Sequence, residues 1–456
     1  MATLENVISR LSDIVWGPPM LVLLVGTGIF LTFRLRLLQF WQLPYALKLA
    51  FSRKQDRSSQ GDVTHFQALT TALAATIGTG NIAGVATAVA TGGPGAVFWM
   101  WVTAIVGMAT KYAEAVLAIK YRVQNDRGEM SGGPMYYIER GLGWKWLAVL
   151  FAIFGAVACF GIGTSVQSNS VADALQSALS VPTWLTGVVL AAFTALVIIG
   201  GIKMIGRVTA FFVPIMALLY LIGGLVVILL HVDKLPAALA LIFTDAFTGE
   251  AVAGGALGTV IRYGVARGVF SNEAGLGSAP IAAAAAKTDH PCRQGLVSMT
   301  GTFLDTIVVC SVTGLVLVMS GLYAEGDLSG ASLTSASFDA LLPGFGSWIV
   351  TIGLILFAYS TVLGWAYYGE KCFEYLFGTS RILWYRWAVV VAVFVGTIVQ
   401  LDLVWSIADV FNGLMAVPNL IALLALSGVV VAETRAFQEK LRMERRTSQP
   451  GTDVTG

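Results

Sequence analysis

The chain has 456 residues, of which 56% are hydrophobic and 12% are charged, and its formal net charge is +2. Ordinary soluble domains carry about twice that share of charged residues, so the composition excludes a typical soluble protein. The four cysteines and three histidines have no metal-binding spacing. The sequence has no basic stripe interleaved with aromatic residues, so we predict no nucleic-acid partner. The composition therefore predicts an all-α polytopic membrane protein embedded in a lipid bilayer.

Eleven segments are long and apolar enough to span a bilayer, because a spanning helix needs about 20 mostly apolar residues. Their approximate limits are 18–37, 66–88, 95–119, 146–168, 184–200, 208–230, 252–286, 294–322, 346–370, 382–400 and 404–431. The seventh is too long and too rich in glycine to form one regular helix. An amphipathic segment precedes the first span. Its apolar face consists of Leu4, Val7, Ile8, Leu11 and Val15.

Positive charge is distributed unevenly between the connections. If successive connections alternate between the two sides of the membrane, 23 of the 28 Lys and Arg residues fall on one side. Only Arg10 and Lys234 fall on the other side, where the acidic connection 323–344 also lies. The positive-inside rule then predicts an extracellular N-terminus and a cytoplasmic C-terminus. Residues 433–456 form a charged cytoplasmic tail in this topology.

Two spans contain stretches that interrupt a regular helix. Residues 76–81 read Thr-Ile-Gly-Thr-Gly-Asn, and residues 268–278 read Gly-Val-Phe-Ser-Asn-Glu-Ala-Gly-Leu-Gly-Ser. Without the first span, the chain divides into two five-helix halves, about 64–230 and 250–432, and each half opens with an interrupted helix. Inverted-repeat transporters have this organisation, and their binding site lies between the broken helices. We therefore predict one transporter domain over residues 1–432.

Unwound backbone inside a membrane must face protein or a wet cavity. Freed N–H groups suit a carboxylate, and freed carbonyl groups suit Na⁺ or an ammonium group. A zwitterionic amino acid needs both in one place. Gly78-x-Gly80 follows an apolar helix rather than a strand, which argues against a dinucleotide loop. The absence of P-loop, HExxH and Gly-x-Ser-x-Gly motifs argues against an ATP pump or a hydrolase, so we predict that the protein is not an enzyme.

Ionisable residues inside spans are candidates for function. We expect Arg262 and Arg267 to form structural ion pairs, with Glu273 as a partner. Lys111 and Glu114 are three residues apart and are expected to pair with each other. Glu273 itself has two interpretations, since its carboxylate can contact a substrate amine or hold the second break open.

Polar residues of the later spans complete the candidates. Asp305 is a candidate cation ligand. Asp409 and Asn412 are either gate residues or partners in hydrogen bonds between helices. Ser360 and Thr361 are adjacent hydroxyls, which can bond back to the preceding turn or, opposite freed carbonyls, form a neutral oxygen cage for a monovalent cation.

At these residues the sequence resembles the sodium:alanine symporter family. The run Gly-Gly-Pro-Gly-Ala-Val-Phe-Trp-Met-Trp at 92–101 follows Gly-Thr-Gly-Asn at 78–81, and the stretches 268–277 and 301–306 are similar to the family as well. The resemblance extends from about residue 15 to residue 435. It implies eleven spans in the five-plus-five fold of the leucine transporter. It also implies Na⁺-coupled uptake of alanine or glycine by alternating access, across the inner membrane of a bacterium.

The resemblance also implies binding residues. For the substrate they are Gly78, Thr79, Gly80, Gln167, Phe270, Asn272, Thr361 and Trp365. One Na⁺ site would comprise the Thr76 carbonyl, Asn81 and Ser271, with Asp305, Thr302 or Thr306 as further ligands. The other would comprise the carbonyl groups of Ala74, Ile77 and Phe357 and the hydroxyl groups of Ser360 and Thr361.

These residues predict a small substrate. Trp365 lies one helical turn after Thr361 on the same face, and together with Phe270 it would leave space for little more than a methyl group. We expect Na⁺ as the coupling ion, no organic cofactor, and a protein that functions as a monomer. The alternative is a proton-coupled transporter of small amino acids, with Glu273 or Asp305 as the proton carrier.

Overall fold

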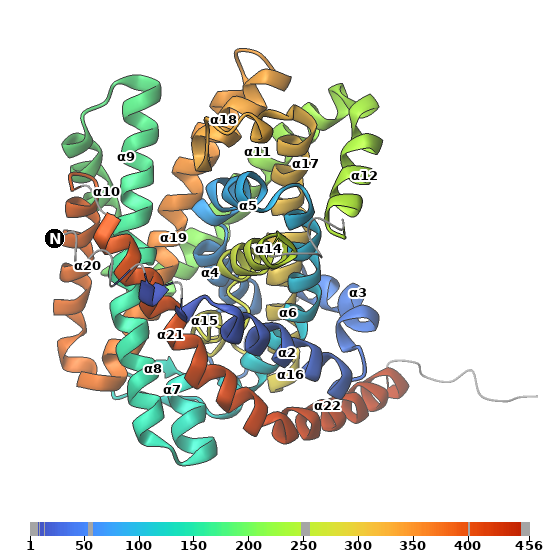
Figure 1. The fold of residues 1–456 in the computed structure, drawn as a ribbon. Coiled ribbons are helices and arrows are strands. Elements are labelled where there is room, and N and C mark those ends of the chain that lie inside the picture. Colours follow the sequence, from blue (N-terminus) through green and yellow to red (C-terminus); the bar gives the residue numbers. More distant parts are fainter. Residues whose placement is uncertain are drawn as a thin grey trace, which may run out of the picture.

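The computed structural model describes residues 8, 10–12, 14–52, 58–247, 256–399 and 402–447. Over these residues nearly all regular structure is helical, and the helices pack into one bundle (Figure 1). The helices of the first part are α2 (Pro18–Arg34), α3 (Leu38–Ala50), α4 (His65–Thr76), α5 (Val85–Gly92), α6 (Gly95–Lys120), α7 (Pro134–Tyr137), α8 (Lys145–Ala158), α9 (Val166–Leu179), α10 (Thr183–Ile198), α11 (Gly201–Leu230) and α12 (Leu235–Asp245).

The second part of the chain continues the bundle. Its helices are α14 (Ala256–Asn272), α15 (Ala279–Ala283), α16 (Pro291–Thr302), α17 (Ser311–Ser320), α18 (Gly330–Leu341), α19 (Gly346–Phe377), α20 (Ile382–Gly396), α21 (Asp402–Ala425) and α22 (Ser427–Thr447). One antiparallel ribbon pairs β1 (Val123–Gln124) with β2 (Met130–Ser131). Short 3₁₀ turns are η4 (Val232–Lys234), η6 (Leu322–Ala324) and η7 (Thr379–Arg381).

Four segments have wide, π-helical turns. They are η1 (Gly80–Gly84), η2 (Ile138–Leu142), η3 (Cys159–Ser165) and η5 (Phe303–Cys310). Such turns are rare and often mark functional sites, because they release backbone groups from the regular ladder. Three of them, η1, η3 and η5, lie within apolar helices of the bundle interior.

The interior is organised around α6, which packs against α14, α16 and α2. Its buried face is formed mainly by small residues, which allow close approach of neighbouring helices. The helix α19 packs against α4, α8, α9 and α11 on the other side of the first broken helix. Segments far apart in the sequence therefore surround the two breaks, at the centre of the bundle in Figure 1.

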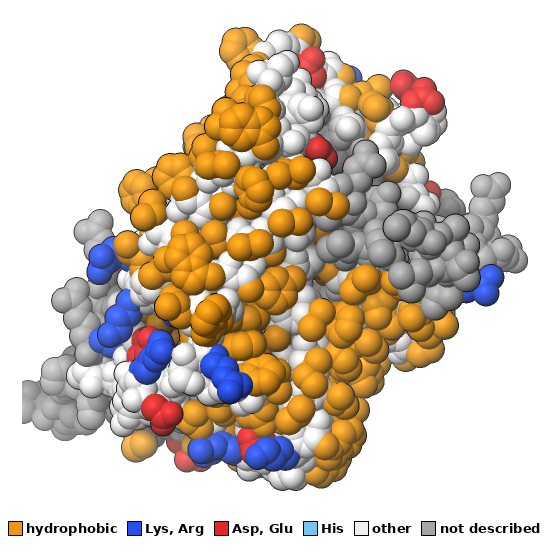
Figure 2. Space-filling model, turned by 90° about the vertical axis from the view of Figure 1, so that its left-hand side faces the viewer, with side chains coloured by type: hydrophobic (Ala, Val, Ile, Leu, Met, Phe, Trp, Pro, Cys, Tyr) orange, Lys and Arg blue, Asp and Glu red, His pale blue; other side chains and the backbone are white. Residues whose placement is uncertain are grey.

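The outer surface is apolar. In Figure 2 hydrophobic side chains cover most of the visible face, and Lys and Arg gather towards its lower end. The exposed fraction reaches 78% for Trp384 and 70% for Leu196, which a surface facing water would disfavour. This distribution fits a multi-pass membrane protein whose belt contacts lipid.

Among the described residues, seven helices are long and apolar enough to cross a membrane, or up to nine if each of two bent pairs is one span. The apolar helix α10 is shorter, and residues 252–255 of the seventh predicted span lie outside the described residues. The count of eleven therefore stays a prediction. The structure also contains helices α3, α12 and α18, which lie within segments predicted to be connections.

The first predicted segment is partly described. Leu4 and Val7 lie outside the described residues, whereas Trp16 is buried and donates from its indole Nε1 to the backbone oxygen of Asp409 at 3.1 Å. Ser12 Oγ donates to Asp409 Oδ2 at 2.6 Å. Of the two interpretations of Asp409, hydrogen bonding between segments is the one that these contacts favour.

Candidate functional site

The first break has a regular helix on each side. α4 begins with a capping box between Thr64 and Gln67 and ends at Thr76, and Ile77 is extended. The helix resumes after the break at an angle of 53°. A Cβ atom on Gly78 would lie 2.4 Å from the Thr361 hydroxyl oxygen, so only glycine allows α19 to approach this closely. The break thus brings freed backbone against α19.

The second break has a different cause. α14 ends at Asn272, and Glu273 adopts the left-handed conformation with φ 56°. Gly275 and Gly277 follow with φ 94° and 84°, a region that glycine occupies without the usual steric penalty. Ser278 Oγ donates to Glu273 Oε2 at 2.6 Å, which ties the turn together. Glu273 therefore does hold the second break in shape.

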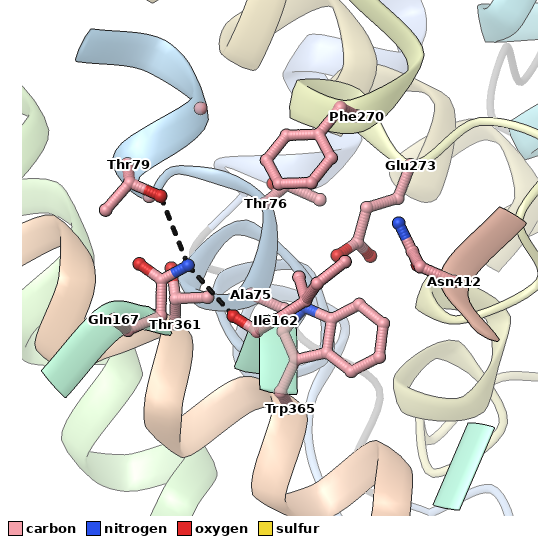
Figure 3. Close-up of a pocket in the computed structure, with 12 residues that line it drawn as sticks. Ala75, Thr76, Thr79, Ile162, Gln167, Phe270, Glu273, Thr361, Trp365 and Asn412 are labelled. Atoms are coloured by element: carbon pink, nitrogen blue, oxygen red, sulfur yellow. Dashed lines mark hydrogen bonds between the residues drawn. The ribbon is translucent and has the colours of Figure 1, made fainter. Parts of the chain in front are cut away.

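A buried cavity lies between the two breaks. It is small in this conformation, with space for about one water molecule (Figure 3). Seven of the eight residues predicted to bind substrate line it: Gly78, Thr79, Gly80, Gln167, Phe270, Thr361 and Trp365. Its other lining residues are Ala75, Thr76, Ile162, Glu273 and Asn412. We call this space the central cavity.

Asn272 is the exception, since it is not among the described residues that line the central cavity. Its Oδ1 accepts a hydrogen bond from the Ala274 amide at 3.0 Å, and its Nδ2 donates to Thr306 Oγ1 at 3.1 Å. Both polar groups of the side chain are used in closing the turn after α14. Asn272 therefore supports the second break instead of lining the central cavity.

The polar groups of the central cavity lie at two ends. In Figure 3 Gln167 and Thr79 stand at one end, and Glu273 and Asn412 at the other. Gln167 Nε2 donates to Thr79 Oγ1 at 3.2 Å and to the Ile162 carbonyl at 3.0 Å. The buried oxygens Gln167 Oε1 and Asn412 Oδ1 have no hydrogen-bond partner within the described chain. Unsatisfied buried acceptors are costly, so they mark where a ligand with donors fits.

Two aromatic rings limit the space between these ends. Phe270 lies on one side of the cavity and Trp365 on the opposite side (Figure 3). The Trp365 side chain is 1% exposed, and its indole lies next to the Glu273 carboxylate. A Cβ atom on Gly163 would be 2.3 Å from Trp365 Cβ, so η3 holds the ring in place by close packing.

A neutral oxygen cluster lies where α19 meets α4. Ser360 Oγ donates to the Phe357 carbonyl at 2.8 Å and lies 3.2 Å from the Ala74 carbonyl and 3.5 Å from that of Ile77. Thr361 Oγ1 lies 3.0 Å from the Phe357 carbonyl and 3.5 Å from that of Ile77. All five predicted residues thus come together. Their oxygens are uncharged, hard donors, and oxygen ligands of this kind suit a hard cation such as Na⁺. We call this group the neutral cluster.

A second cluster contains a buried carboxylate. Asp305 Oδ1 accepts from Asn81 Nδ2 at 2.7 Å, and Oδ2 accepts from Ser271 Oγ and Thr306 Oγ1, each at 2.8 Å. Asn81 Oδ1 in turn accepts from the Gly78 amide at 2.9 Å. Asp305 is fully buried on η5. We call this group the Asp305 cluster; it joins the first break to the second through η5.

Cys310 contacts the Asp305 cluster, whereas the predicted ligands Thr302 and Thr76 have no side-chain hydrogen bond to it among the described residues. No sequence pattern indicated Cys310, whose Sγ lies 3.3 Å from both Asn81 Nδ2 and Ser271 Oγ. Thr302 Oγ1 is buried and has no hydrogen-bond partner among the described residues. Thr76 lines the central cavity, and its hydroxyl donates to the Leu73 carbonyl at 3.4 Å.

Two expected ion pairs do not form. Lys111 makes no ion pair with Glu114 in the described chain; Glu114 Oε1 instead accepts from the Gly275 amide at 3.1 Å and from Asn419 Nδ2 at 2.7 Å. The guanidinium of Arg267 lies over the Phe270 ring, 5.8 Å from its centroid, rather than on Glu273. Helical spacing predicted the pair of Lys111 with Glu114, but packing brings Glu114 to the Gly275 amide and Asn419 instead.

The outer side of Phe270 faces another cavity. It is larger than the central cavity, and its lining residues include Arg262, Arg267 and Asp409. Phe270 belongs to the walls of both cavities. The ring therefore separates the central cavity from this outer space.

Comparison with known proteins gives a consistent result. The family model described as the sodium:alanine symporter family matches residues 1–450. The sodium/alanine symporter AgcS of Methanococcus maripaludis is 63% identical over 450 residues, which cover 97% of this chain and 99% of that one. The probable sodium/glutamine symporter GlnT of Bacillus subtilis is 38% identical and covers 98% of this chain and 93% of its own. The putative sodium/proton-dependent alanine carrier protein YrbD of the same species is 39% identical, and the matched residues cover 96% of this chain and 93% of that one.

Proposed function

Because the chain belongs to the sodium:alanine symporter family, whose members are transporters, we propose that it couples inward Na⁺ movement to the uptake of alanine or glycine by alternating access. The proposed topology has eleven spans in a five-plus-five inverted repeat, with the N-terminus outside and the C-terminus in the cytoplasm. Lys and Arg gathered at one end of the bundle support that orientation. The protein would act in a cell membrane as a monomer.

The main observation that supports the proposal is the central cavity. At one end the helix resumes at Gly80, and its first amide groups suit the substrate carboxylate. At the other end the Glu273 carboxylate and the unpaired Asn412 oxygen suit an ammonium group. A zwitterionic amino acid would therefore bridge the two breaks. Phe270 and Trp365 would confine its side chain to about the size of a methyl group.

The two oxygen clusters support coupling to Na⁺. Each includes atoms of the first break, so each can influence how the backbone presents amides to the substrate. The neutral cluster offers carbonyl and hydroxyl oxygens, and the Asp305 cluster adds one negative charge. An ion at either place would neutralise freed acceptors that lipid cannot satisfy. Driving force would come from the membrane potential, at about 2.3 kcal/mol per charge for each 100 mV.

Alternating access would require the walls of the central cavity to open in turn. Phe270 lines both the central cavity and the outer cavity, and Thr76 lines both the central cavity and a further buried cavity. The two breaks supply hinges on both sides of the substrate, since their backbone is already released from regular helix. Such a closed arrangement fits a state between outward and inward opening.

Uptake of labelled alanine into proteoliposomes tests the proposal. We expect accumulation that depends on an inward Na⁺ gradient at constant pH and that K⁺ cannot replace. Glycine should compete strongly and leucine weakly. Accumulation that ignores Na⁺ would overturn the coupling, and strong competition by glutamine would overturn the proposed limit on substrate size.

A proton-coupled transporter is the alternative. The buried carboxylates of Glu273 and Asp305, one in the central cavity and one beside it, are the observation that favours it. Uptake driven by an inward proton gradient in the absence of Na⁺, and abolished by Glu273→Gln or Asp305→Asn, would support this alternative over Na⁺ symport.

A further inference from the structure

A further buried cavity adjoins the central cavity. It has space for about one water molecule in this conformation. It is lined by parts of α4, α6, α15 and α16, with Thr76 common to both walls. Among the described residues of its lining, Lys111 of α6 is the only charged one. We call it the Lys111 cavity.

The Lys111 cavity lies on the side of the breaks where positive charge gathers. Its α4 residues precede the first break and follow the basic connection 51–63, and its α15 residues follow the second break and precede Lys287. On α6, Gly107 lies against Ala274 of the second break, and Lys111 follows one turn later, on the way to Lys120 and Arg122. The proposed topology therefore places this cavity between the central cavity and the cytoplasm.

Lys111 has an unusual environment for a buried ammonium group. Its side chain is 3% exposed, and its Nζ has no hydrogen-bond partner among the residues that the structure describes. Leaving such a group without a partner costs several kcal/mol or more, so a ligand or water is expected at its donors. The charge itself is balanced at longer range by Glu114, Glu273 and Asp305.

These neighbours explain what kind of ligand fits. Glu114, Glu273 and Asp305 interact with Lys111 only at longer range and leave its N–H groups without a hydrogen-bond partner in the described chain, so these donors are available to a ligand. Three N–H donors that point into a small cavity suit the oxygens of a carboxylate or another small anion. The cavity adjoins the place where a zwitterionic substrate would sit.

We propose that the Lys111 cavity is a release site, in which Lys111 takes the carboxylate of the amino acid as it passes Thr76 towards the cytoplasm. This inference rests on the proposed function. A transient site with a matching charge divides departure from the central cavity into two smaller steps. A free inorganic anion such as chloride has the same chemistry, and the experiment below separates the two sources.

The test uses the Lys111→Met and Lys111→Arg variants in proteoliposomes of defined orientation. The alanine concentration for half-maximal transport is measured separately from the outer and the cytoplasmic face. Loss of one charged hydrogen bond should raise the cytoplasmic value about tenfold or more in Lys111→Met. The outer value should change less than about twofold, and Lys111→Arg should preserve both. Lys48→Met on α3, outside the cavity, is the matched control.

A second variant fills the cavity and keeps the lysine. A Cβ atom on Gly301 would meet only Leu69 at 3.6 Å and Leu73 at 3.8 Å, which are ordinary contacts. Gly301→Val should therefore be tolerated and should produce the same loss on the cytoplasmic face alone. It keeps the inference testable if Lys111→Met does not insert correctly.

Each outcome decides between explanations. If wild-type protein shows no Na⁺-driven alanine uptake, the proposed function fails. If uptake is present but the cytoplasmic value is unchanged in Lys111→Met and Gly301→Val, only the release site fails. Equal changes on both faces would indicate a structural role and overturn it. Wild-type transport that requires chloride, with that requirement lost in Lys111→Met, would reassign the site to an inorganic anion.

Discussion

The neutral cluster and the Asp305 cluster solve the same problem in different ways. In the neutral cluster, the hydroxyl groups of Ser360 and Thr361 face backbone carbonyls at 2.8 to 3.5 Å, and no charged group takes part. In the Asp305 cluster, one carboxylate accepts three side-chain hydrogen bonds at 2.7 to 2.8 Å. The neutral cluster therefore has hydrogen bonds between uncharged groups over a wide range of distances. The Asp305 cluster has three short hydrogen bonds to one carboxylate.

This difference indicates how each cluster would respond to a cation. Rotation of two hydroxyl hydrogens exposes the neutral cluster to an ion at small cost, because its contacts are uncharged and three of the five are 3.2 Å or longer. An ion at the Asp305 cluster must compete with hydrogen bonds to a charged acceptor, which are about twice as strong as neutral ones. We therefore expect the Asp305 cluster to be the more sensitive of the two to the removal of one group.

The largest effect is expected for Asp305→Asn. The variant removes the negative charge and replaces one acceptor oxygen by an NH₂ donor. Because Asn81, Ser271 and Thr306 all donate hydrogen bonds to Asp305, one of these hydrogen bonds can no longer form. We expect the Na⁺ concentration for half-maximal uptake to rise about a hundredfold or uptake to be lost, as for other broken buried charge networks.

The control for this prediction is Asp327→Asn, because Asp327 is an exposed residue of the acidic connection. Its transport should be unchanged. A correctly inserted Asp305→Asn protein with the Na⁺ dependence of the wild type would remove the Asp305 cluster from the coupling mechanism.

A smaller effect is expected for Thr361→Ala, which removes one oxygen of the neutral cluster. Loss of one buried polar ligand is worth roughly 1–3 kcal/mol, so the Na⁺ concentration for half-maximal uptake should rise several-fold. Thr351→Ala is the matched control, because Thr351 lies on the same helix and its hydroxyl donates to Ser347 of the preceding turn at 2.8 Å. Equal Na⁺ dependence in both variants would contradict a role for Thr361 as an ion ligand.

A third change should alter the substrate and leave both ion clusters intact. Trp365→Ala enlarges the central cavity, so alanine should bind more weakly while valine or leucine begins to compete. One methylene group in an apolar pocket is worth about 1–3 kcal/mol, which competition uptake can measure. Unaltered selectivity in a folded variant would show that Trp365 does not set substrate size, and a changed Na⁺ dependence would link the ring to the ion clusters.

The last prediction concerns the orientation of the chain in the membrane, and its two cysteine substitutions should have the smallest effect on transport. Labelling of these cysteines establishes which connections face the outside. All four native cysteines are buried, so background labelling should be low. Asp327→Cys should react with an impermeant thiol reagent from outside the cell, and Asp126→Cys should not. Both residues are exposed and lie in connections on opposite sides of the proposed topology. The reverse pattern would invert the orientation.

Much of the site could be predicted from local sequence. The glycines at 78 and 80 and the run from 268 to 278 cannot continue a regular helix in lipid without exposing backbone groups, so they had to mark breaks facing a cavity. Adjacent hydroxyls at 360 and 361 predicted an oxygen cluster for a similar reason. These inferences depend on residues close together in the chain, where composition and helical period carry the information.

Contacts between distant segments were decided by the tertiary structure. Asn412 and Ile162 line the central cavity together because α21 and η3 pack against each other, and no local pattern predicts that packing. Asn272 turned inward to Thr306, and Lys111 faces its own cavity instead of pairing with Glu114. The sequence alone determined where the helices break and which end is basic, since both follow from local composition. Which side chains share a cavity depended on helix packing, because a buried polar group takes whichever partner the neighbouring helix brings within hydrogen-bond distance.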